Sequence, residues 1–222
     1  MCCDLILCLL LNNLTGDKSM RFMANAPIPQ KPEGAEEFEK QGISELVKAL
    51  HDHTDPQVRQ YAAYLLGQAK SPQAIQPLIK ALADFDKSVR EQATLALSAI
   101  GKAAIEPLAE AMKEPKWETR YRAAEALGKI ADEKAVKPLI QGLRDNRDHV
   151  RYMAAKGLHE IGDSDAVEPL IMLLTDENVF VRLMVVHALA ALGGKKVNAA
   201  LTTALGSEQE DKVKAAITAA LQ

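Results

Sequence analysis

The histidines are the residues that first suggest metal chemistry in this sequence of 222 residues. His51 and His53 alternate near the end of an expected helix, so their side chains diverge, and His149 and His187 each stand alone. Residues 159–160 form one adjacent His-Glu pair. A structural zinc site needs four Cys or His ligands, and the three cysteines all lie within the first eight residues. We therefore predict no metal and no cofactor.

Arginines followed by acids at a fixed distance are the stronger chemical pattern. A basic residue follows an apolar residue or Thr six times, at intervals of 31, 30, 31, 31 and 32 residues. These anchors are Arg59, Arg90, Arg120, Arg151, Arg182 and Lys214. The last five have an acid six positions earlier: Asp84, Glu114, Asp145, Asp176 and Glu208. Because Arg in the first turn of a helix opposes the helix dipole, we predict a ladder of charge-assisted bonds between each Arg and an acid of its own or the adjacent repeat.

The same interval organises the apolar residues into pairs of helices. Small residues follow the first four anchors by three and four positions, and Leu follows all six by seven, which is helical spacing. A proline 17 or 18 positions after the anchor, as at Pro77, suits the first turn of a helix, where no N–H is needed. The expected first helices lie near 43–52, 73–83, 104–113, 134–144, 165–175 and 196–206, and the second helices near 56–69, 87–100, 117–130, 148–161, 179–192 and 210–221.

Composition agrees with a helical stack. The chain is 48% hydrophobic and only 4% aromatic, which suits tightly packed helices better than sheets. One helix pair cannot bury its apolar stripe alone, whereas stacked pairs can. The predicted fold is all-α, a right-handed α-solenoid of about six two-helix repeats over residues 41–222. Residues 1–40 are expected to be a poorly ordered leader and linker, with Met20 or Met23 as alternative starts to Met1.

The repeat resembles the HEAT-like repeats named from phycobilisome lyases. Residues 145–170, "DNRDHVRYMAAKGLHEIGDSDAVEPL", match the family's repeat phrase best, and the resemblance covers about 41–222. It implies the solenoid fold. For function it is less specific, because the family includes chromophore lyases, adaptor proteins, designed binders and an iron-dependent hydroxylase.

In that family the second helices line a concave surface, which implies a candidate partner-binding face. Its expected outward residues are Tyr61, Tyr64, Gln92, Leu95, Tyr121, Arg122, Glu125, Tyr152, Met153, Lys156, Met184 and His187. Exposed Tyr, Met and Arg are enriched at protein interfaces. Two alternatives remain: the tyrosines only cover neighbouring helices, or the face is a groove for a small molecule or bilin. Trp117, Phe85 and Phe180, which lie just before anchors, are expected to pack in turns.

The resemblance leaves two enzymatic alternatives. One is a bilin lyase-like role in chromophore maturation. The other is the iron-dependent hydroxylase, whose several His-Glu pairs come directly after the anchor Arg. Here the residues after the Arg anchors are Gln60, Glu91, Tyr121, Tyr152 and Leu183, none of them His.

The favoured interpretation is a non-enzymatic protein-binding or scaffold module, with another protein as the partner. The net charge of −3 argues against nucleic-acid binding, and the apolar run near the start is too short to span a membrane. We expect a cytoplasmic location and at most weak end-to-end self-association, because the last helix, "DKVKAAITAALQ", has no obvious polar cap.

Overall fold

The computed structural model describes residues 28–33, 35 and 42–222, and the expectations for residues 1–27 fall outside that part. The chain divides into two compact units, one up to Ile130 and one from Ala131 onward. In the described part all regular structure is helical, which confirms the all-α class. No helix there is long and apolar enough to cross a bilayer.

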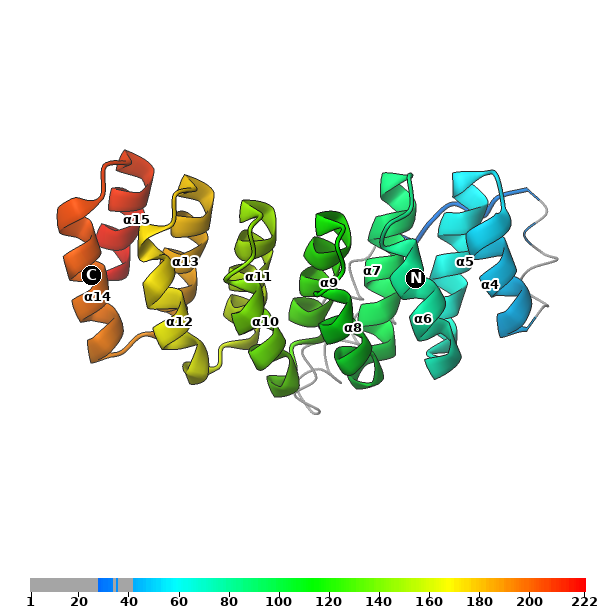
Figure 1. Ribbon diagram of the computed structural model, residues 1–222, viewed down its shortest axis with the longest axis horizontal. Helices are drawn as coiled ribbons and strands as arrows, with labels where there is room; N and C mark the ends of the chain where they lie inside the picture. The colour runs from blue at the N-terminus through cyan, green and yellow to red at the C-terminus, as the bar shows by residue number, and fades with distance from the viewer. Residues whose placement is uncertain (1–27, 34, 36–41) are drawn as a thin grey trace, which may run out of the picture. The chain divides into compact units, whose positions relative to one another are not determined.

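The first unit contains three stacked helix pairs (Figure 1). Helices α4 (Ile43–Asp52), α6 (Ile75–Ala81) and α8 (Ile105–Ala111) are the first helices. They are drawn in front of their partners, α5 (Pro56–Ala69), α7 (Lys87–Ile100) and α9 (Trp117–Ile130). Short 3₁₀ turns, Pro72–Ala74 and Gly101–Ala104, lead into α6 and α8. The second helices lie side by side, since α7 contacts both α5 and α9.

The second unit repeats this arrangement. Its first helices are α10 (Val136–Gly142), α12 (Val167–Met172) and α14 (Lys195–Ser207). Its second helices are α11 (Asp148–Ile161), α13 (Val179–Leu192) and α15 (Asp211–Ala220), and α13 contacts both α11 and α15. The 3₁₀ turns here are Glu133–Ala135, Ser164–Ala166 and Leu173–Thr175. Each unit is therefore a stack of helix pairs, as in an α-solenoid.

Four first helices, α6, α8, α10 and α12, are shorter than expected, because a 3₁₀ turn takes the place of their first residues. In α6, Pro77 is the third residue, within the first turn as predicted. Ser71 accepts a hydrogen bond from the backbone N–H of Gln73 and so caps the preceding 3₁₀ turn. The second helices from α5 to α13 begin and end where the sequence places them, and the side chains of Asp55, Asp86 and Asn178 cap the starts of α5, α7 and α13.

Small residues and leucines of both helices of the repeats form the core between the layers. Leu66, Leu97 and Leu127 of the first unit and Leu158 and Leu189 of the second are all 0% exposed. Burying a leucine side chain contributes roughly 1.5–3 kcal/mol. The core therefore supplies most of the energy that stacks one repeat on the next.

Helices α5 and α7 pack closely against each other at a glycine of α5. A Cβ atom added to Gly67 would lie 2.8 Å from both Cα and Cβ of Ala96. Real Cβ atoms do not come this close to backbone, so only glycine fits at this point of α5. The close approach depends on having small residues on both helices.

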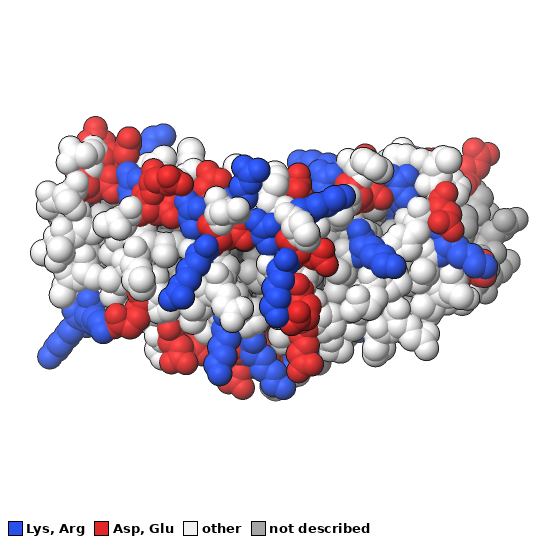
Figure 2. All heavy atoms as spheres, in the orientation of Figure 1, with Lys and Arg blue, Asp and Glu red and all other residues white. Residues whose placement is uncertain are grey.

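Arginines at the start of the second helices join adjacent repeats. In three repeats the Nε and Nη2 atoms of Arg donate to both oxygens of an acid 25 or 26 residues later, at 2.7–3.0 Å: Arg59 to Asp84, Arg151 to Asp176, and Arg182 to Glu208. The Nη1 atom of each donates to a backbone carbonyl six residues before the Arg, in the turn of its own repeat. The predicted contact thus uses the acid of the following turn and the carbonyl of the preceding one. Blue and red atoms alternate along this loop edge in each unit (Figure 2).

These bonds shift the ionisation of both partners. Hydrogen bonds that the arginines donate to the acids raise the pKa of Arg59, Arg151 and Arg182, since they outweigh burial. Burial alone would raise the pKa of Asp84, but hydrogen bonds from Arg59 and a backbone N–H outweigh it, and the pKa is lowered. The hydrogen bond from Arg182 lowers the pKa of Glu208 from 4.5 to about 2.

Two arginines of the predicted ladder differ from this pattern. Arg90 donates only through Nη1, to the carbonyls of Asp84 and Phe85, and has no carboxylate partner. Arg120 donates Nη1 to the carbonyls of Glu114 and Pro115. The acid expected to bind Arg120 is Asp145, which belongs to the other unit. The contact between these two side chains therefore stays a prediction.

The described residues before α4 are partly enclosed. Pro29 is buried, Ala35 is 0% exposed, and the N–H of Ala35 donates to the carbonyl of Pro32 at 3.2 Å.

At the other end of the chain, α15 exposes Ala215 and Ala219. End-to-end self-association through this surface stays a prediction.

Replacing Gly67 by Ala should destabilise the protein. Alanine favours a helix by about 1 kcal/mol over glycine, but forcing α5 away from α7 costs more, roughly 1–3 kcal/mol. We expect a net loss of about 1 kcal/mol in urea unfolding followed by circular dichroism. The control is Gly206→Ala in α14, where nothing lies within 4 Å of the added Cβ. That variant should be as stable as wild type or more so, and equal stability of Gly67→Ala would show that the helices separate at no cost.

Replacing Glu208 by Gln should destabilise the protein in a pH-dependent way. The folded-state pKa of Glu208, about 2, lies below the unfolded value of 4.5. Its stabilising contribution is therefore present above pH 4.5 and is lost as the pH falls toward 2. At pH 7 we expect Glu208→Gln to cost about 2 kcal/mol, and the difference from wild type should disappear near pH 2. Glu210→Gln, an exposed acid of the same turn, is the control and should change little.

Candidate functional site

The second-helix face of the first unit is formed by α5, α7 and α9, and it carries most of the predicted partner-binding residues. We use this name for the half-buried side chains that it presents: Tyr64, Leu95, Tyr121, Arg122 and Glu125. In the second unit the corresponding residues are Tyr152, which is half-buried, and Lys156 and His187, which are exposed. Each unit therefore brings its own set of predicted residues together on neighbouring second helices.

Four residues predicted to point outward are instead buried. Tyr61, Gln92, Met153 and Met184 are 6%, 5%, 5% and 8% exposed. All four lie two positions after an anchor, as does Arg122, whose side chain is 13% exposed. Successive helical residues are about 100° apart, so the positions one and two after the anchor cannot both point outward. At Tyr61, Gln92, Met153 and Met184 the side chain is buried against the rest of the unit, and the expectation of exposure was wrong for these four.

Aromatic rings and one arginine form a packed group on α9. The rings of Trp117 and Tyr121 meet edge to face, with their centroids 6.4 Å apart and the planes at 75°. The guanidinium carbon of Arg122 lies 5.3 Å from the centroid of the Tyr121 ring, within cation–π range. On α5 the rings of Tyr61 and Tyr64 stack with their centroids 6.0 Å apart. The half-buried rings are thus held by contacts within the unit.

Ion pairs connect α7 with α9 across this face. Arg122 lies 2.8 Å from Glu125 of its own helix and 3.5 Å from Glu91 of α7. Lys129 lies 3.8 Å from Glu125, and Lys87 lies 3.6 Å from Glu91. Arg122 and Glu125 are only 13% and 21% exposed, so solvent screens this pair less than a surface pair. The network fixes the orientation of Arg122.

The histidines do not converge. Among the described residues no group of three His, Cys, Asp or Glu side chains lies close enough to hold a metal ion. His149 bonds to Asp148 at 2.7 Å, and this bond lowers the pKa of the carboxylate. Burial, followed by the charge of Lys80, lowers the pKa of His51. The Nδ1 atom of His159 is buried and has no hydrogen-bond partner.

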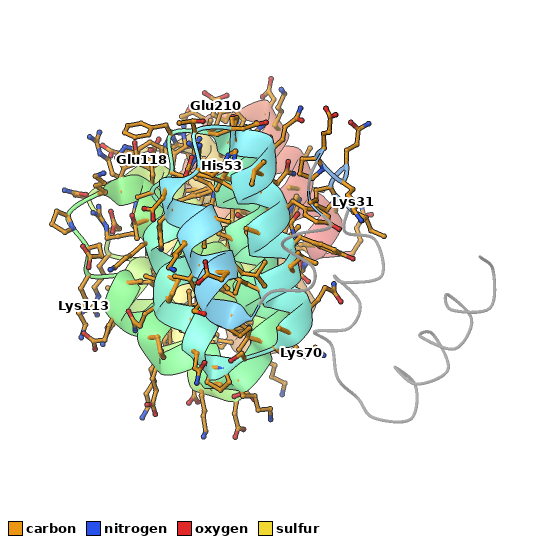
Figure 3. The ribbon with its side chains drawn as sticks, turned by 90° about the vertical axis from the view of Figure 1, so that its right-hand side faces the viewer. Lys31, His53, Lys70, Lys113, Glu118 and Glu210 are labelled. Atoms are coloured by element: carbon orange, nitrogen blue, oxygen red, sulfur yellow. The ribbon has the colours of Figure 1, made fainter. Side chains whose placement is uncertain are left out.

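Two cavities of the first unit lie away from the second-helix face. One, of about 300 Å³, lies between α6 and α8 and is lined by Ile79, Pro107 and Pro115 among others. The other, of about 420 Å³, lies at the loop edge and is lined in part by Phe85, Arg90 and Lys116. His53 and Glu118 lie at that end of the helices, and Lys70 lies at the opposite end (Figure 3).

Sequence reasoning missed the aromatic residues at the turns. Phe85 and Phe180 are 102% and 66% exposed, although both were expected to pack in turns. Phe85 lies in the loop before α7, next to the capping residue Asp86, whereas Phe180 is the second residue of α13. Trp117, the first residue of α9, instead meets the ring of Tyr121 four residues along the same helix.

Comparison with known proteins places the chain among repeat proteins. The family model described as HEAT repeats matches residues 43–128, 102–151 and 136–222. No curated protein matches the chain by sequence.

Solved structures share the fold. The complex of CpcE and CpcF of phycocyanin lyase from Nostoc sp. PCC7120 has 24% identity and a TM-score of 0.63, covering 68% of this chain and 100% of that one. A designed armadillo repeat protein in complex with the peptide (KR)4 has 24% identity and a TM-score of 0.53, covering 82% of this chain and 98% of that one. A computationally designed armadillo repeat protein for modular peptide recognition has 23% identity and a TM-score of 0.52, covering 81% and 98%.

Three observations thus indicate the same kind of repeat protein: the repeated anchors, the stacked helix pairs and the family match. The matched segments together extend from residue 43 to residue 222. The chain belongs to the HEAT-repeat family.

Proposed function

We propose that the chain is a non-enzymatic protein-binding module whose second-helix face contacts a partner polypeptide. The observation that carries the proposal is the group of Trp117, Tyr121 and Arg122 on α9. These three residue types dominate the energetic centres of protein interfaces. Here they lie together on one helix, and ion pairs to Glu91 and Glu125 hold the arginine.

Pre-organisation supports the same proposal. Immobilising a flexible side chain on binding costs about 0.5–1.5 kcal/mol. Arg122 has already lost this freedom, since it contacts Glu91, Glu125 and the Tyr121 ring. A partner that meets this side chain gains contacts without ordering it first.

The chemistry of the face favours a polypeptide with mixed apolar and charged side chains. Leu95 and the tyrosines offer apolar area, while Glu91 and Lys129 offer charges of both signs. A surface for nucleic acid would instead carry an excess of basic residues. The designed armadillo repeat protein of the same fold was solved with a peptide, which is the class of ligand proposed here.

Replacing Tyr64, Tyr121 and Tyr152 together by Ala should abolish partner capture and leave the helical circular dichroism intact. The measurement is quantitative mass spectrometry after capture from lysate, with a photo-crosslinking amino acid in place of Leu95 to mark proteins that touch this face. A protein crosslinked through position 95 by wild type should be absent with the triple variant. Lys156→Glu alone tests the face of the second unit without disturbing a packed ring, and should weaken capture at least several-fold.

The matched control carries Gln76→Ala, Glu106→Ala and Lys137→Ala. These exposed residues directly precede the prolines of three first helices, on the opposite side of the repeats. The control should capture the same protein as wild type. Capture that survives the tyrosine replacements would overturn the proposal, and a new absorption band on mixing with phycocyanobilin would favour the lyase-like alternative.

A further inference from the structure

Arg90 has an unused hydrogen-bonding edge. Its Nη1 donates to the carbonyls of Asp84 and Phe85 at 2.7 and 2.9 Å, as in the other repeats. In Arg59 and Arg182 the Nε and Nη2 atoms bind both oxygens of a carboxylate at 2.8–2.9 Å. In Arg90 the same two atoms bind no carboxylate. The anchor is thus in place, but its acid is missing.

The missing acid has a local cause in the loop between α8 and α9. The acid expected there, Glu114, is followed directly by Pro115, which restricts the backbone of the preceding residue. The paired acids also accept a backbone N–H two residues later, as Asp84 does from Asp86. Glu114 makes no such side-chain bond and is exposed. Its carboxylate therefore does not fill the place beside Arg90.

A cavity lies at this place. It has a volume of about 420 Å³ and is lined by Ala83, Asp84, Phe85, Arg90, Lys116 and Glu118. Asp84 is already bound to Arg59, and Lys116 and Glu118 are exposed. The Phe85 ring at the rim is fully exposed, at 102%. One half-buried arginine, one lysine and an uncovered aromatic ring thus surround an open space.

We propose that this cavity, the Arg90 site, binds a carboxylate of a partner peptide, supplied by an acidic residue that is followed by an apolar one. The carboxylate accepts from Nε and Nη2 of Arg90, in the geometry that the other arginines use for Asp and Glu. Lys116 adds a second positive charge. The apolar side chain covers the Phe85 ring, which nothing in the described chain covers.

A carboxylate fits the site better than a phosphate. The corresponding edges of Arg59, Arg151 and Arg182 are all occupied by planar carboxylates bound through two oxygens. Glu118 at the cavity would repel a doubly charged phosphate more strongly than a singly charged carboxylate. The Arg90 site lies at the loop edge and does not depend on the second-helix face, so either proposal can fail alone.

The probe is the blocked dipeptide N-acetyl-Asp-Leu-amide, with N-acetyl-Asn-Leu-amide as its neutral counterpart. The readout is the Nε–Hε resonance of Arg90 in nuclear magnetic resonance spectra, assigned through its absence in Arg90→Lys. We expect a saturable shift with a Kd of about 1 mM, equivalent to −4.1 kcal/mol, and no shift with the Asn probe. The corresponding resonances of Arg59 and Arg182, which are already bonded, should not move.

Two exposed positions supply the variants. Lys116→Glu provides an internal carboxylate and reverses the charge, so it should weaken binding at least tenfold. Lys70→Glu makes the same change of charge at the opposite end of the helices (Figure 3) and should leave binding unchanged. Phe85→Ala should weaken binding of the Leu probe several-fold and leave that of N-acetyl-Asp-Gly-amide unchanged.

Three outcomes would overturn the proposal. They are the absence of an Arg90 shift with the Asp probe, an equal shift with the Asn probe, and binding that persists in Lys116→Glu. Inorganic phosphate that shifts Arg90 at lower concentration than the Asp probe would also overturn it, because the ligand class would then be wrong. Capture through the second-helix face should be the same in Lys116→Glu as in wild type, which separates this test from that of the proposed function.

Discussion

In three repeats an arginine bonds in two directions, and the alignment of consecutive turns there depends on these bonds. The Nη1 atom of Arg182 holds the turn before its own helix, and the opposite edge holds Glu208 of the next turn. Because the guanidinium group is planar and rigid, these two sets of bonds also fix the distance between consecutive turns. The leucines supply most of the burial energy, but burial has no direction. The arginine supplies the register that burial lacks.

Helix boundaries and the pairing of helices could be predicted because they depend on neighbours in sequence. Capping residues such as Asp86, the proline in the first turn of α6 and the helical spacing of alanines each act over a few residues. Repetition then multiplied this local information, since one repeat could be interpreted from the others. The acidic partners of Arg59 and Arg182 could be predicted for the same reason, because each lies in the turn that follows its arginine.

Burial at single positions could not be predicted from the repeat alone. Tyr61 and Met184 lie on the side of their helix that faces a neighbouring helix, and both are buried. Their exposure depends on the distance between the two helices, which the repeat phrase does not contain. Phe85 resembles Trp117 in sequence context, yet it lies two residues before α7 begins, whereas Trp117 is the first residue of α9. The missing partner of Arg90 follows from a single departure, Pro115 after Glu114, whose effect depends on the loop geometry.

The bonds between repeats are short-range in sequence, with 25 or 26 residues between Arg and acid. Chains whose contacts are local fold faster than chains that must close long loops. Each helix pair needs only the next turn to complete its bonds. The repeats can therefore order one after another as the chain leaves the ribosome, before the final helices have been synthesised.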